Sequence, residues 1–409
     1  MAKLRILLSE GSSTSAREAL TLLHRKGHEV EICDPDWHCL TRFSRFVSRF
    51  HLCPPLRDDP AGYLAFIEDL LERRHFDVLL PIHEQGLLFS RIRERLGARV
   101  AIALPSFESY RTAVRKSDFS RLLQEISLPQ PPTRIVTWAD VAALATYPCV
   151  VKAPVGTASR GTAVLHTSAD IPVVRAAMAD IKLATDEVLL QEFVPGVVER
   201  AQAVFCDGEL IGFHAYRQLR AGAGGGDAAK ESVSRPQVRV DLARVGNRLA
   251  WHGALSVDYI LDVSRRAPVY IDCNPRLVEP MNAAIAGVDL VELLLAVSLG
   301  NRPVPVPDGI AGVRTHLALQ VLMGQALASG RRRDILRETC NLCARRGPFA
   351  DSIEELTPVG EDWLSAVPFV VTAAALLLWP RAARGLQRKG WGEHLLSEDT
   401  IASISQGLV

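Results

Sequence analysis

The sequence predicts a fold of the α/β and α+β classes, with a parallel sheet first, a second α/β region next and a mostly helical region last. The first hundred residues alternate apolar strand-like runs with helical patterns. Such alternation is typical of a parallel sheet covered by helices on both faces. Prolines in the segment 127–133 predict an extended linker, after which strand-like and helix-like patterns return. We therefore expect three regions, at 1–110, 111–305 and 306–409.

Each expected element of the first region follows from a local pattern. Residues 4–9 form a continuous apolar run, as a strand that is buried on both faces does. Gly27 ends the helical pattern that starts at Thr14. The turn after the first strand has one glycine where a dinucleotide-binding fingerprint has three, so we expect a structural or substrate-binding turn. The expected strands are 4–9, 28–34, 76–82 and 98–106, and the expected helices are 14–25 and 63–74.

A glycine-rich loop follows a lysine at the end of a short apolar strand. Lys152 ends that strand, and Gly156, Ser159 and Gly161 lie in the loop that leads to the next strand. Glycines allow backbone N–H groups to approach phosphate oxygens, and a lysine beside them supplies a compact positive charge. The pattern predicts a phosphate-binding loop, although an ordinary hairpin with one basic residue would contain the same residue types.

Oxygen-donating side chains occur in two later strands. Asp258 lies inside the apolar run 255–262, and Asp272 and Asn274 are two residues apart on the next strand, hence on one face. An acid flanked by apolar strand residues is rarely buried without a partner. Three such oxygen donors on neighbouring strands fit a Mg²⁺ ion that also holds phosphates. A buried hydrogen-bond network is the alternative for each of them.

In their order along the chain, these segments resemble the ATP-grasp superfamily, in which two α+β subdomains clamp ATP. The resemblance covers residues 1–305, because a leading parallel α/β domain also suits that superfamily. The stretch from Asn274 to Arg276 is similar to the Asn-Pro-Arg stretch of its carbamoyl-phosphate-synthase-like and biotin-carboxylase-like branch. No single motif is specific, whereas the ordered set is. The matching positions are Lys116, Lys152, the loop 156–161, the segment 191–199, Asp258, Asp272 and Asn274.

The resemblance implies an ATP-dependent ligase that activates a carboxylate as an acyl phosphate for attack by an amine or similar nucleophile. Its cofactors would be ATP and Mg²⁺, with Mn²⁺ as an alternative metal, and its substrates would be small molecules. The implied ATP-binding residues are Lys116, Lys152, Gly156, Ser159 and Gly161 for the phosphates, Gln191, Glu192 and Val194 for adenine, and Glu199 for the ribose. The implied metal ligands are Asp258, Asp272 and Asn274, and Arg276 would stabilise the transferring phosphoryl group or the acyl phosphate.

Two further segments are candidates for contact with the reacting groups. The glycine-rich stretch 214–232 is expected to be a mobile lid, with Arg217 and Lys230 as catalytic charges. Solvated loop charges are the alternative for both residues. The other segment follows the strand expected at 76–82, where open α/β sheets bind ligands, and its candidate substrate-binding residues are His83, Glu84 and Gln85. A purely structural role is the alternative for Glu84.

Two departures from the superfamily pattern leave other functions open. The acid of the acid-x-Asn pair is usually Glu, but here it is Asp272, which is one methylene shorter. Several members also carry Arg two residues before the late acid, whereas this chain has Ser256. The alternatives are a catalytically degenerate nucleotide-binding or regulatory protein, and an ATP-grasp phosphotransferase without an amine acceptor.

The net charge and the N-terminal sequence indicate which partners and which cell compartment to expect. The formal net charge of +1 gives no reason to expect a nucleic-acid partner, and a homodimer is an alternative to a monomer. The N-terminus lacks the apolar core and cleavage site of a secretion signal, which predicts a cytoplasmic protein. The eight cysteines are therefore expected to be reduced. Cys340 and Cys343 form one CxxC pair, and a tetrahedral zinc site would need two more ligands.

An apolar stretch near the C-terminus, 364–379, is shorter than the roughly 20 residues of a membrane-spanning helix and contains Pro368. We expect it to form a buried helix. The alternatives are a true span and a helix that lies peripherally on the inner face of the membrane, with the segment 364–391 in contact with the surface. The basic residues that would anchor such a helix are Arg381, Arg384, Arg388 and Lys389.

Overall fold

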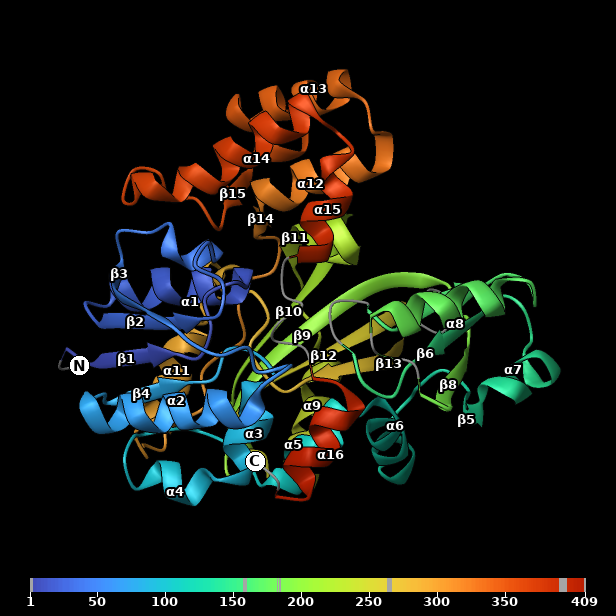
Figure 1. Ribbon diagram of the computed structural model, residues 1–409, viewed down its shortest axis with the longest axis horizontal. Helices are drawn as coiled ribbons and strands as arrows, with labels where there is room; N and C mark the ends of the chain where they lie inside the picture. The colour runs from blue at the N-terminus through green and yellow to red at the C-terminus, as the bar shows by residue number, and fades with distance from the viewer. Residues whose placement is uncertain are drawn as a thin grey trace.

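The structure is a computed structural model of the 409-residue chain, in which residues 3–156, 160–181, 183, 185–262, 267–389 and 396–407 are described. The described residues form three β-sheets (Figure 1). A parallel N-terminal sheet lies on one side of a long central sheet, a small sheet lies on the other side, and C-terminal helices lie beyond one end of the central sheet. This architecture confirms the predicted combination of α/β and α+β folds with a mostly helical C-terminal region.

The N-terminal sheet has four parallel strands in the order β3-β2-β1-β4. The expectation of a strand over 98–106 is wrong, because only Ala101 in this segment pairs, through a single bridge to Val78. The fourth strand is instead β3 at the opposite edge, whose largely exposed residues gave no apolar run in the sequence. The strands are β1 Arg5–Leu8, β2 Glu29–Asp34, β3 Val47–Leu52 and β4 Val78–Leu80.

Local capping explains where the first helices begin. The Ser13 side chain accepts a hydrogen bond from the Ala16 N–H group at the start of α1, and the Asp59 side chain accepts one from Gly62 at the start of α2. Pro60 suits the first position of α2, since its missing N–H group would have no partner there. The helices of this region are α1 Thr14–Arg25, α2 Pro60–Arg73, α3 Gln85–Arg91, α4 Arg93–Gly97 and α5 Phe107–Val114, with the short 3₁₀ turn η1 Leu40–Arg42.

The central sheet has the strand order β13-β12-β9-β10-β11-β14-β15 and is antiparallel except for the pair β14–β15. Its two faces meet different partners. Phe205 on β9 packs in one core with Leu242 of α9, whereas the neighbouring Val204 packs in another core with Leu290 of α11 and Ile6 of the N-terminal sheet. The strands are β9 Gly196–Cys206, β10 Glu209–Ala221, β11 Asp227–Ser232, β12 Gly253–Asp262, β13 Ala267–Asn274, β14 Arg314–His316 and β15 Ser352–Glu354. The helices against it are α9 Pro236–Arg248, α10 Met281–Ile285 and α11 Leu290–Ser298.

The small sheet is antiparallel, has the order β5-β8-β6-β7 and encloses its own core, which includes Trp138, Val151 and Leu165. Residues 193–195 connect β8 of this sheet to β9 of the central sheet. The strands are β5 Thr133–Thr137, β6 Cys149–Lys152, β7 Thr162–Leu165 and β8 Glu187–Glu192, and the helices beside them are α6 Lys116–Glu125, α7 Trp138–Leu144 and α8 Asp170–Asp180.

The glycine run does not form the mobile lid that the sequence predicted. Most of the stretch 214–232 belongs to the antiparallel strands β10 and β11, and the 3₁₀ turn η2 Ala223–Gly225 joins them. Gly224 and Gly225 have φ values of 65° and 78°, in the left-handed region that glycine adopts readily. The glycines therefore serve a tight connection between two paired strands, and the residues of β11 are buried.

The C-terminal helices α12, α13 and α14 share a core that includes Val321, Ile335 and Leu376. The last helix, α16, lies apart from them and contacts α3 of the N-terminal region (Figure 1). The helices are α12 Ala318–Ser329, α13 Arg332–Cys343, α14 Ala366–Leu378, α15 Ala382–Lys389 and α16 Glu398–Ser405, with the 3₁₀ turns η3 Gly347–Phe349 and η4 Trp363–Ser365.

The expectation of a buried helix over 364–379 holds for one side of α14 only. Ala373 and Leu376 are buried against α12 and α13, whereas Val370, Val371 and Leu378 are exposed. Among the described residues, no helix combines the length and the apolar character that crossing a bilayer requires.

Candidate functional site

Three predicted metal ligands lie on one face of the central sheet. Asp258 on β12 pairs directly with Asp272 on β13, and Ser256 pairs with Asn274 two residues along. Because side chains alternate along a strand, all four side chains lie on the same face. Among the described residues, Oδ1 of Asp258 accepts no hydrogen bond. Burial raises the pKa of Asp258, an effect that nearby Arg200 opposes. The donor set and the unsatisfied buried oxygen fit a divalent cation with oxygen ligands.

An arginine that the sequence analysis missed faces these acids. Arg200 on β9 pairs in register with Asp258, and its Nε lies 3.4 Å from Oδ1 of that residue. The same guanidinium contacts Asp227 of β11 at 2.5 Å. Burial lowers the pKa of Arg200, but Asp227 and Asp258 outweigh it and raise that pKa. The position directly after Glu199 gave no sequence signal, because only the strand register shows which face the side chain occupies.

Two lysines reach the same acids from other elements. Lys116, the first residue of α6, contacts both carboxylate oxygens of Asp272. Lys152, the last residue of β6, donates a hydrogen bond from Nζ to the backbone oxygen of Ile271 at 2.6 Å. Burial lowers the pKa of Lys152 to about 8, although Asp272 opposes the shift. The structure thus brings together Lys116, Lys152, Asp258, Asp272 and Asn274, which the sequence had placed in separate segments.

The loop after β6 needs glycine at both of its described ends. Gly156 has a φ of 152°, and a Cβ atom there would lie 2.3 Å from the backbone oxygen of Arg160. Gly161 has a φ of 75° and would place a Cβ atom 3.0 Å from that of Ala153. Side chains would therefore force the loop apart. Ser159 lies outside the described residues.

The predicted adenine-binding residues lie where the small sheet leads into the central sheet. Gln191 is buried and donates to the Thr133 hydroxyl at 2.9 Å, whereas Glu192 is exposed and Val194 is half-buried. A cavity of about 10 Å³ lies between α6, β8 and β13, and Lys116, Gln191 and Asp272 are among the residues that line it. This volume is about that of one water molecule, so the two sheets are closed against each other here.

Two predicted site residues lie on the opposite face of the central sheet. Glu199 pairs in register with Tyr259 and Arg217, one position away from the Asp258 face. Its carboxylate accepts hydrogen bonds from Arg235 at 2.7 Å and from the Tyr259 hydroxyl at 2.8 Å. Arg217 is about half exposed and pairs with Glu231. The structure therefore does not bring Glu199 or Arg217 to the acids and lysines.

Lys230 lies on the same face as Arg200, at the centre of a fully buried charge cluster. Its Nζ lies 2.7 Å from Glu279 and 2.9 Å from Glu355. Burial lowers the pKa of Lys230, but these two carboxylates outweigh it and raise that pKa well above its usual value. Glu18 of α1 is also buried here, and burial together with Glu355 raises its pKa. Three glutamates therefore surround one ammonium group, and they come from regions far apart in the sequence.

Hydrogen bonds fix Glu279 in an unusual backbone conformation. Its φ of 54° lies in the left-handed region, which residues other than glycine rarely adopt. The Ser15 hydroxyl accepts from its N–H group at 3.1 Å, and the Thr14 hydroxyl donates to its carboxylate at 3.1 Å. The start of α1 thus determines where this carboxylate meets Lys230. The sequence analysis assigned Glu279 no role.

Arg276 is buried beside the metal-ligand candidates. Its guanidinium donates to Oδ1 of Asn274 at 3.3 Å, and its backbone oxygen accepts from the Ser256 hydroxyl at 2.6 Å. Ser256, the departure from the superfamily pattern, therefore supports the loop that carries Arg276. In the part of the chain that the structure describes, the cationic group that pairs with Asp258 is Arg200, at 3.4 Å.

Solved structures resemble this chain over most of its length, whereas neither a protein-family model nor a curated protein sequence matches it. An ADP complex of purK, an N5-carboxyaminoimidazole ribonucleotide synthetase, is 14% identical with a TM-score of 0.60, covering 81% of this chain and 87% of its own. L-amino acid ligase from Bacillus licheniformis is 15% identical with a TM-score of 0.61, and the match covers 78% of this chain and 81% of the ligase. A third similar structure is the biotin carboxylase domain dimer of Hydrogenobacter thermophilus 2-oxoglutarate carboxylase, in complex with MgADP, ADP and bicarbonate. It is 14% identical with a TM-score of 0.60, and the match covers 76% of this chain and 73% of that domain. At these identities the likeness concerns the fold.

The chain has the ATP-grasp fold. In this fold the N-terminal sheet carries the predicted substrate-binding residues just beyond β4. His83, Glu84 and Gln85 are all buried, and Gln85 accepts from the Ser9 hydroxyl at 3.2 Å. Oε2 of Glu84 accepts from the Leu396 N–H group at 2.7 Å, so this carboxylate also fastens the chain that leads into α16.

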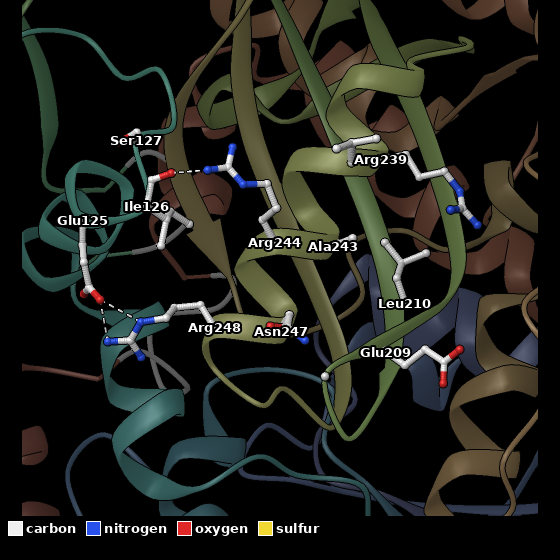
Figure 2. A pocket seen from close by; sticks show the side chains of 12 residues that line it. Glu125, Ile126, Ser127, Glu209, Leu210, Arg239, Ala243, Arg244, Asn247 and Arg248 are labelled. Carbon is white, nitrogen blue, oxygen red and sulfur yellow. Dashed lines mark hydrogen bonds and ion pairs between the residues drawn. The ribbon is translucent and has the colours of Figure 1, made fainter.

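A wide groove of about 850 Å³ lies away from these residues, on the α9 side of the ATP-grasp fold (Figure 2). Its arginines are already engaged: Arg248 pairs with Glu125, and Arg244 donates to the backbone oxygen of Ile126. None of the predicted site residues lines this groove. We therefore do not assign the nucleotide site to it.

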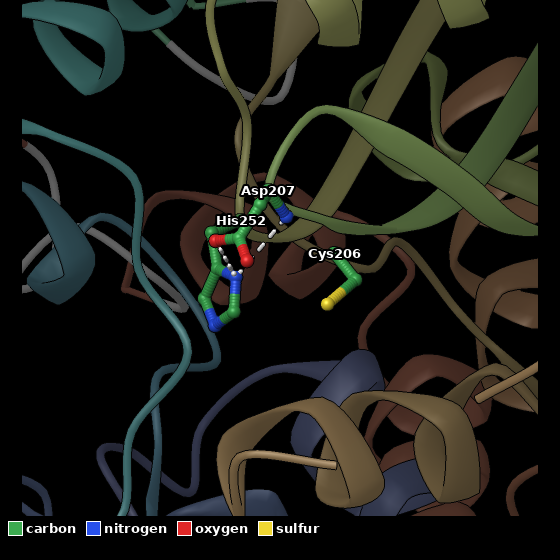
Figure 3. Close-up of side chains that lie close together, drawn as sticks. All are labelled: Cys206, Asp207 and His252. Atoms are coloured by element: carbon green, nitrogen blue, oxygen red, sulfur yellow. Dashed lines mark hydrogen bonds and ion pairs between the residues drawn. The ribbon is translucent and has the colours of Figure 1, made fainter. Parts of the chain in front are cut away.

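A small cluster at the tip of the hairpin β9–β10 has a structural explanation. Cys206, Asp207 and His252 lie close together there (Figure 3). Asp207 has a φ of 48° and precedes Gly208, as expected for a tight hairpin turn. Nδ1 of His252 accepts from the Asp207 N–H group at 3.3 Å, and Arg302 pairs with the carboxylate at 2.6 Å. These contacts engage the His252 nitrogen and the Asp207 carboxylate, two of the three atoms that a cation would need.

Proposed function

We propose that this chain is an ATP-dependent, ADP-forming ligase that activates a carboxylate for attack by an amine or a similar nucleophile. The observation that carries the proposal is the meeting of two lysines from separate elements with Asp258, Asp272 and Asn274 on one face of the central sheet. The structural neighbours support it, since their names include synthetase and amino acid ligase and two of them contain ADP.

In this proposal, ATP enters between the small sheet and the central sheet. A cavity of about 10 Å³ is too small for a nucleotide, so the two sheets must separate when ATP binds. The small sheet joins the rest of the chain at two places, before β5 and through residues 193–195 after β8, and we expect these connections to act as hinges. Glu192 and Val194 would then meet adenine at this connection. We leave Glu199 out of the nucleotide site, because Arg235 and Tyr259 hold its carboxylate on the other face.

When ATP binds, its phosphates would replace Asp272 and the backbone oxygen of Ile271 as the partners of the two lysines. Lys116 contacts both oxygens of Asp272, so it must turn away before Asp272 can ligate a metal. The triphosphate offers Lys116 and Lys152 an anionic partner, and Asp258, Asp272 and Asn274 would then hold Mg²⁺. When bound, Mg²⁺ neutralises the charge of the phosphate oxygens. Gly156 and Gly161 let the loop backbone approach the phosphates.

The reaction has two bond exchanges. A carboxylate oxygen of the substrate attacks the γ-phosphorus while the bond to ADP breaks, which gives an acyl phosphate. The nucleophile then attacks the acyl carbon, and phosphate leaves. Arg200 and Arg276 supply positive charge beside the transferring group, an effect that is strong in a site that excludes water. Lys230 lies further along the same face, but its ammonium group is fully buried and already paired with Glu279 and Glu355, so we leave it out of the substrate site.

Two measurements test the proposal without knowledge of the natural amine. The first is nucleotide affinity by calorimetry, in which Lys152→Ala should weaken ATP binding about 10- to 100-fold, since hydrogen bonds to charged groups contribute about 1.5–3 kcal/mol. The control is Lys26→Ala, which changes a half-exposed lysine directly after α1 and should leave the affinity unchanged. If Lys152→Ala binds ATP normally but has lost stability, the phosphate assignment is wrong.

The second measurement is the formation of hydroxamate from a pool of carboxylic acids with ATP, Mg²⁺ and hydroxylamine as a general nucleophile. Acid-dependent release of ADP with hydroxamate is the expected result. Asp272→Asn should abolish it while the wild-type chain retains it. Tight ATP binding without ADP release for any acid would favour the degenerate nucleotide-binding alternative, which the shorter Asp272 first suggested.

A further inference from the structure

An exposed apolar surface covers the outer side of α14. We define this α14 surface by its large exposed side chains, which are Trp363, Val370, Val371, Leu378 and Trp379, with exposed fractions of 58%, 58%, 61%, 65% and 74%. On a helix, residues three and four apart share a face, so Val367, Val370, Val371, Ala374 and Leu378 form one stripe along α14. The stripe points away from Ala373 and Leu376, which are buried against α12 and α13.

A tryptophan lies at each end of this surface, and arginines gather at its C-terminal end. Trp363 lies just before α14 and Trp379 just after it. Arg381 and Arg384 follow and are exposed, and Arg332 donates to the backbone oxygen of Leu378 at 2.6 Å, which places a further exposed arginine at the same end. The sequence from 363 to 392 contains no Asp or Glu. The surface is therefore apolar along its length and basic at its C-terminal end, whereas the exposed Glu361 lies two residues before Trp363 at the other end.

We infer that the α14 surface docks on the surface of an anionic lipid bilayer. Three observations favour this occupant. Tryptophans at both ends of an apolar stripe suit the headgroup level of a bilayer. The basic C-terminal end complements anionic lipid, and no acidic residue lies between 363 and 392. At 13 residues, or about 20 Å, α14 is too short to span the apolar core but long enough to lie in the interface. The helix remains fastened to the protein by its inner side.

Co-sedimentation with vesicles tests this inference on the full-length chain without nucleotide. The wild-type chain should bind phosphatidylcholine vesicles that contain one third phosphatidylglycerol, should bind pure phosphatidylcholine poorly, and should be released by high salt. Arg381→Gln/Arg384→Gln should weaken binding roughly 30-fold, which corresponds to about 1 kcal/mol for each arginine near the surface. Val371→Ser/Trp379→Ser should remove binding to both kinds of vesicle.

The matched control is Val173→Ser/Arg175→Gln on α8, which removes one exposed apolar and one exposed basic side chain elsewhere. This variant should bind as the wild-type chain does, and unchanged melting temperatures show that all variants fold. Failure of the wild-type chain to bind anionic vesicles, or equal loss in the control, overturns the inference. So does a wild-type dimer in light scattering that Val371→Ser/Trp379→Ser converts to a monomer, because a second copy of the chain would then cover the surface. ATP binding enters none of these measurements, so the inference and the proposed function fail independently.

Discussion

The buried cluster around Lys230 makes a strong prediction about stability. Lys230→Met keeps most of the side-chain volume but removes the ammonium group that lies 2.7 Å from Glu279 and 2.9 Å from Glu355. Lys230 and Glu355 are both fully buried, so water cannot replace the lost partner. Removal of one partner from a buried ion pair costs about 3–5 kcal/mol, which for a domain of 150–250 residues lowers the melting temperature by roughly 10 °C.

A double variant separates the charge effect from packing. Glu355→Gln alone removes one of three carboxylates around a single ammonium group and should cost much less than Lys230→Met. Combined with Lys230→Met, it should restore part of the lost stability, with a coupling of about 1–3 kcal/mol. The control is Lys26→Met, since Lys26 is about half exposed and 3.3 Å from Asp289. An exposed pair of this kind contributes at most about 1 kcal/mol.

The effect should also depend on pH with a defined sign. The folded chain raises the pKa of Glu18 and of Glu355 above the usual value of 4.5. A raised carboxyl pKa contributes stability that is full below the unfolded value and is lost as the pH rises through the folded value. Without the ammonium group of Lys230, that loss should be larger. Thermal unfolding followed by circular dichroism should therefore show a larger deficit for Lys230→Met near pH 8 than near pH 5. Equal melting temperatures for Lys230→Met and Lys26→Met at both pH values would refute this account of the cluster.

Two further predictions concern packing and the attachment of the C-terminal region. Gly246→Ala would place a Cβ atom 2.1 Å from the ring of Phe205, so we expect the free energy of unfolding to fall by about 1–3 kcal/mol. The control Gly97→Ala meets no neighbour within 4 Å and should be nearly neutral. Equal melting temperatures for the two variants would show that the contact with Phe205 relaxes freely. Asp362→Ala leaves the buried guanidinium of Arg17 without its carboxylate, which lies at 2.7 Å, and should cost about 3–5 kcal/mol. Limited proteolysis should then release the C-terminal helices first, and unchanged cleavage would count against this pair as their anchor.

Several elements were predictable from the sequence because their signals are local. The predicted helix 14–25 coincides with α1, since Ser13 caps it and Gly27 follows it. Strands that are buried on both faces, such as β1, appear as continuous apolar runs. Edge strand β3 was missed because its residues alternate weakly and are largely exposed. The glycine run was misinterpreted because glycine serves a tight turn between paired strands as well as a flexible loop.

For the candidate site, too, the sequence predicted only the features that depend on local patterns. The sequence by itself determined the order of Lys152, Asp258, Asp272 and Asn274, and the alternation of strand residues already placed the last two on one face. Only the tertiary structure decided that Arg200 joins them, because register across three strands fixes which side chains become neighbours.

Tertiary structure also decided on which face Glu199 lies and which residues surround Lys230. Glu199 is adjacent to Arg200 in sequence, yet the pleat of β9 sends the two side chains to opposite faces. Glu18 and Glu355 meet Lys230 although more than a hundred residues separate each of them from it. Local patterns record the residue types and the elements that carry them. Contacts between distant segments arise only when burial of the apolar faces brings those elements together.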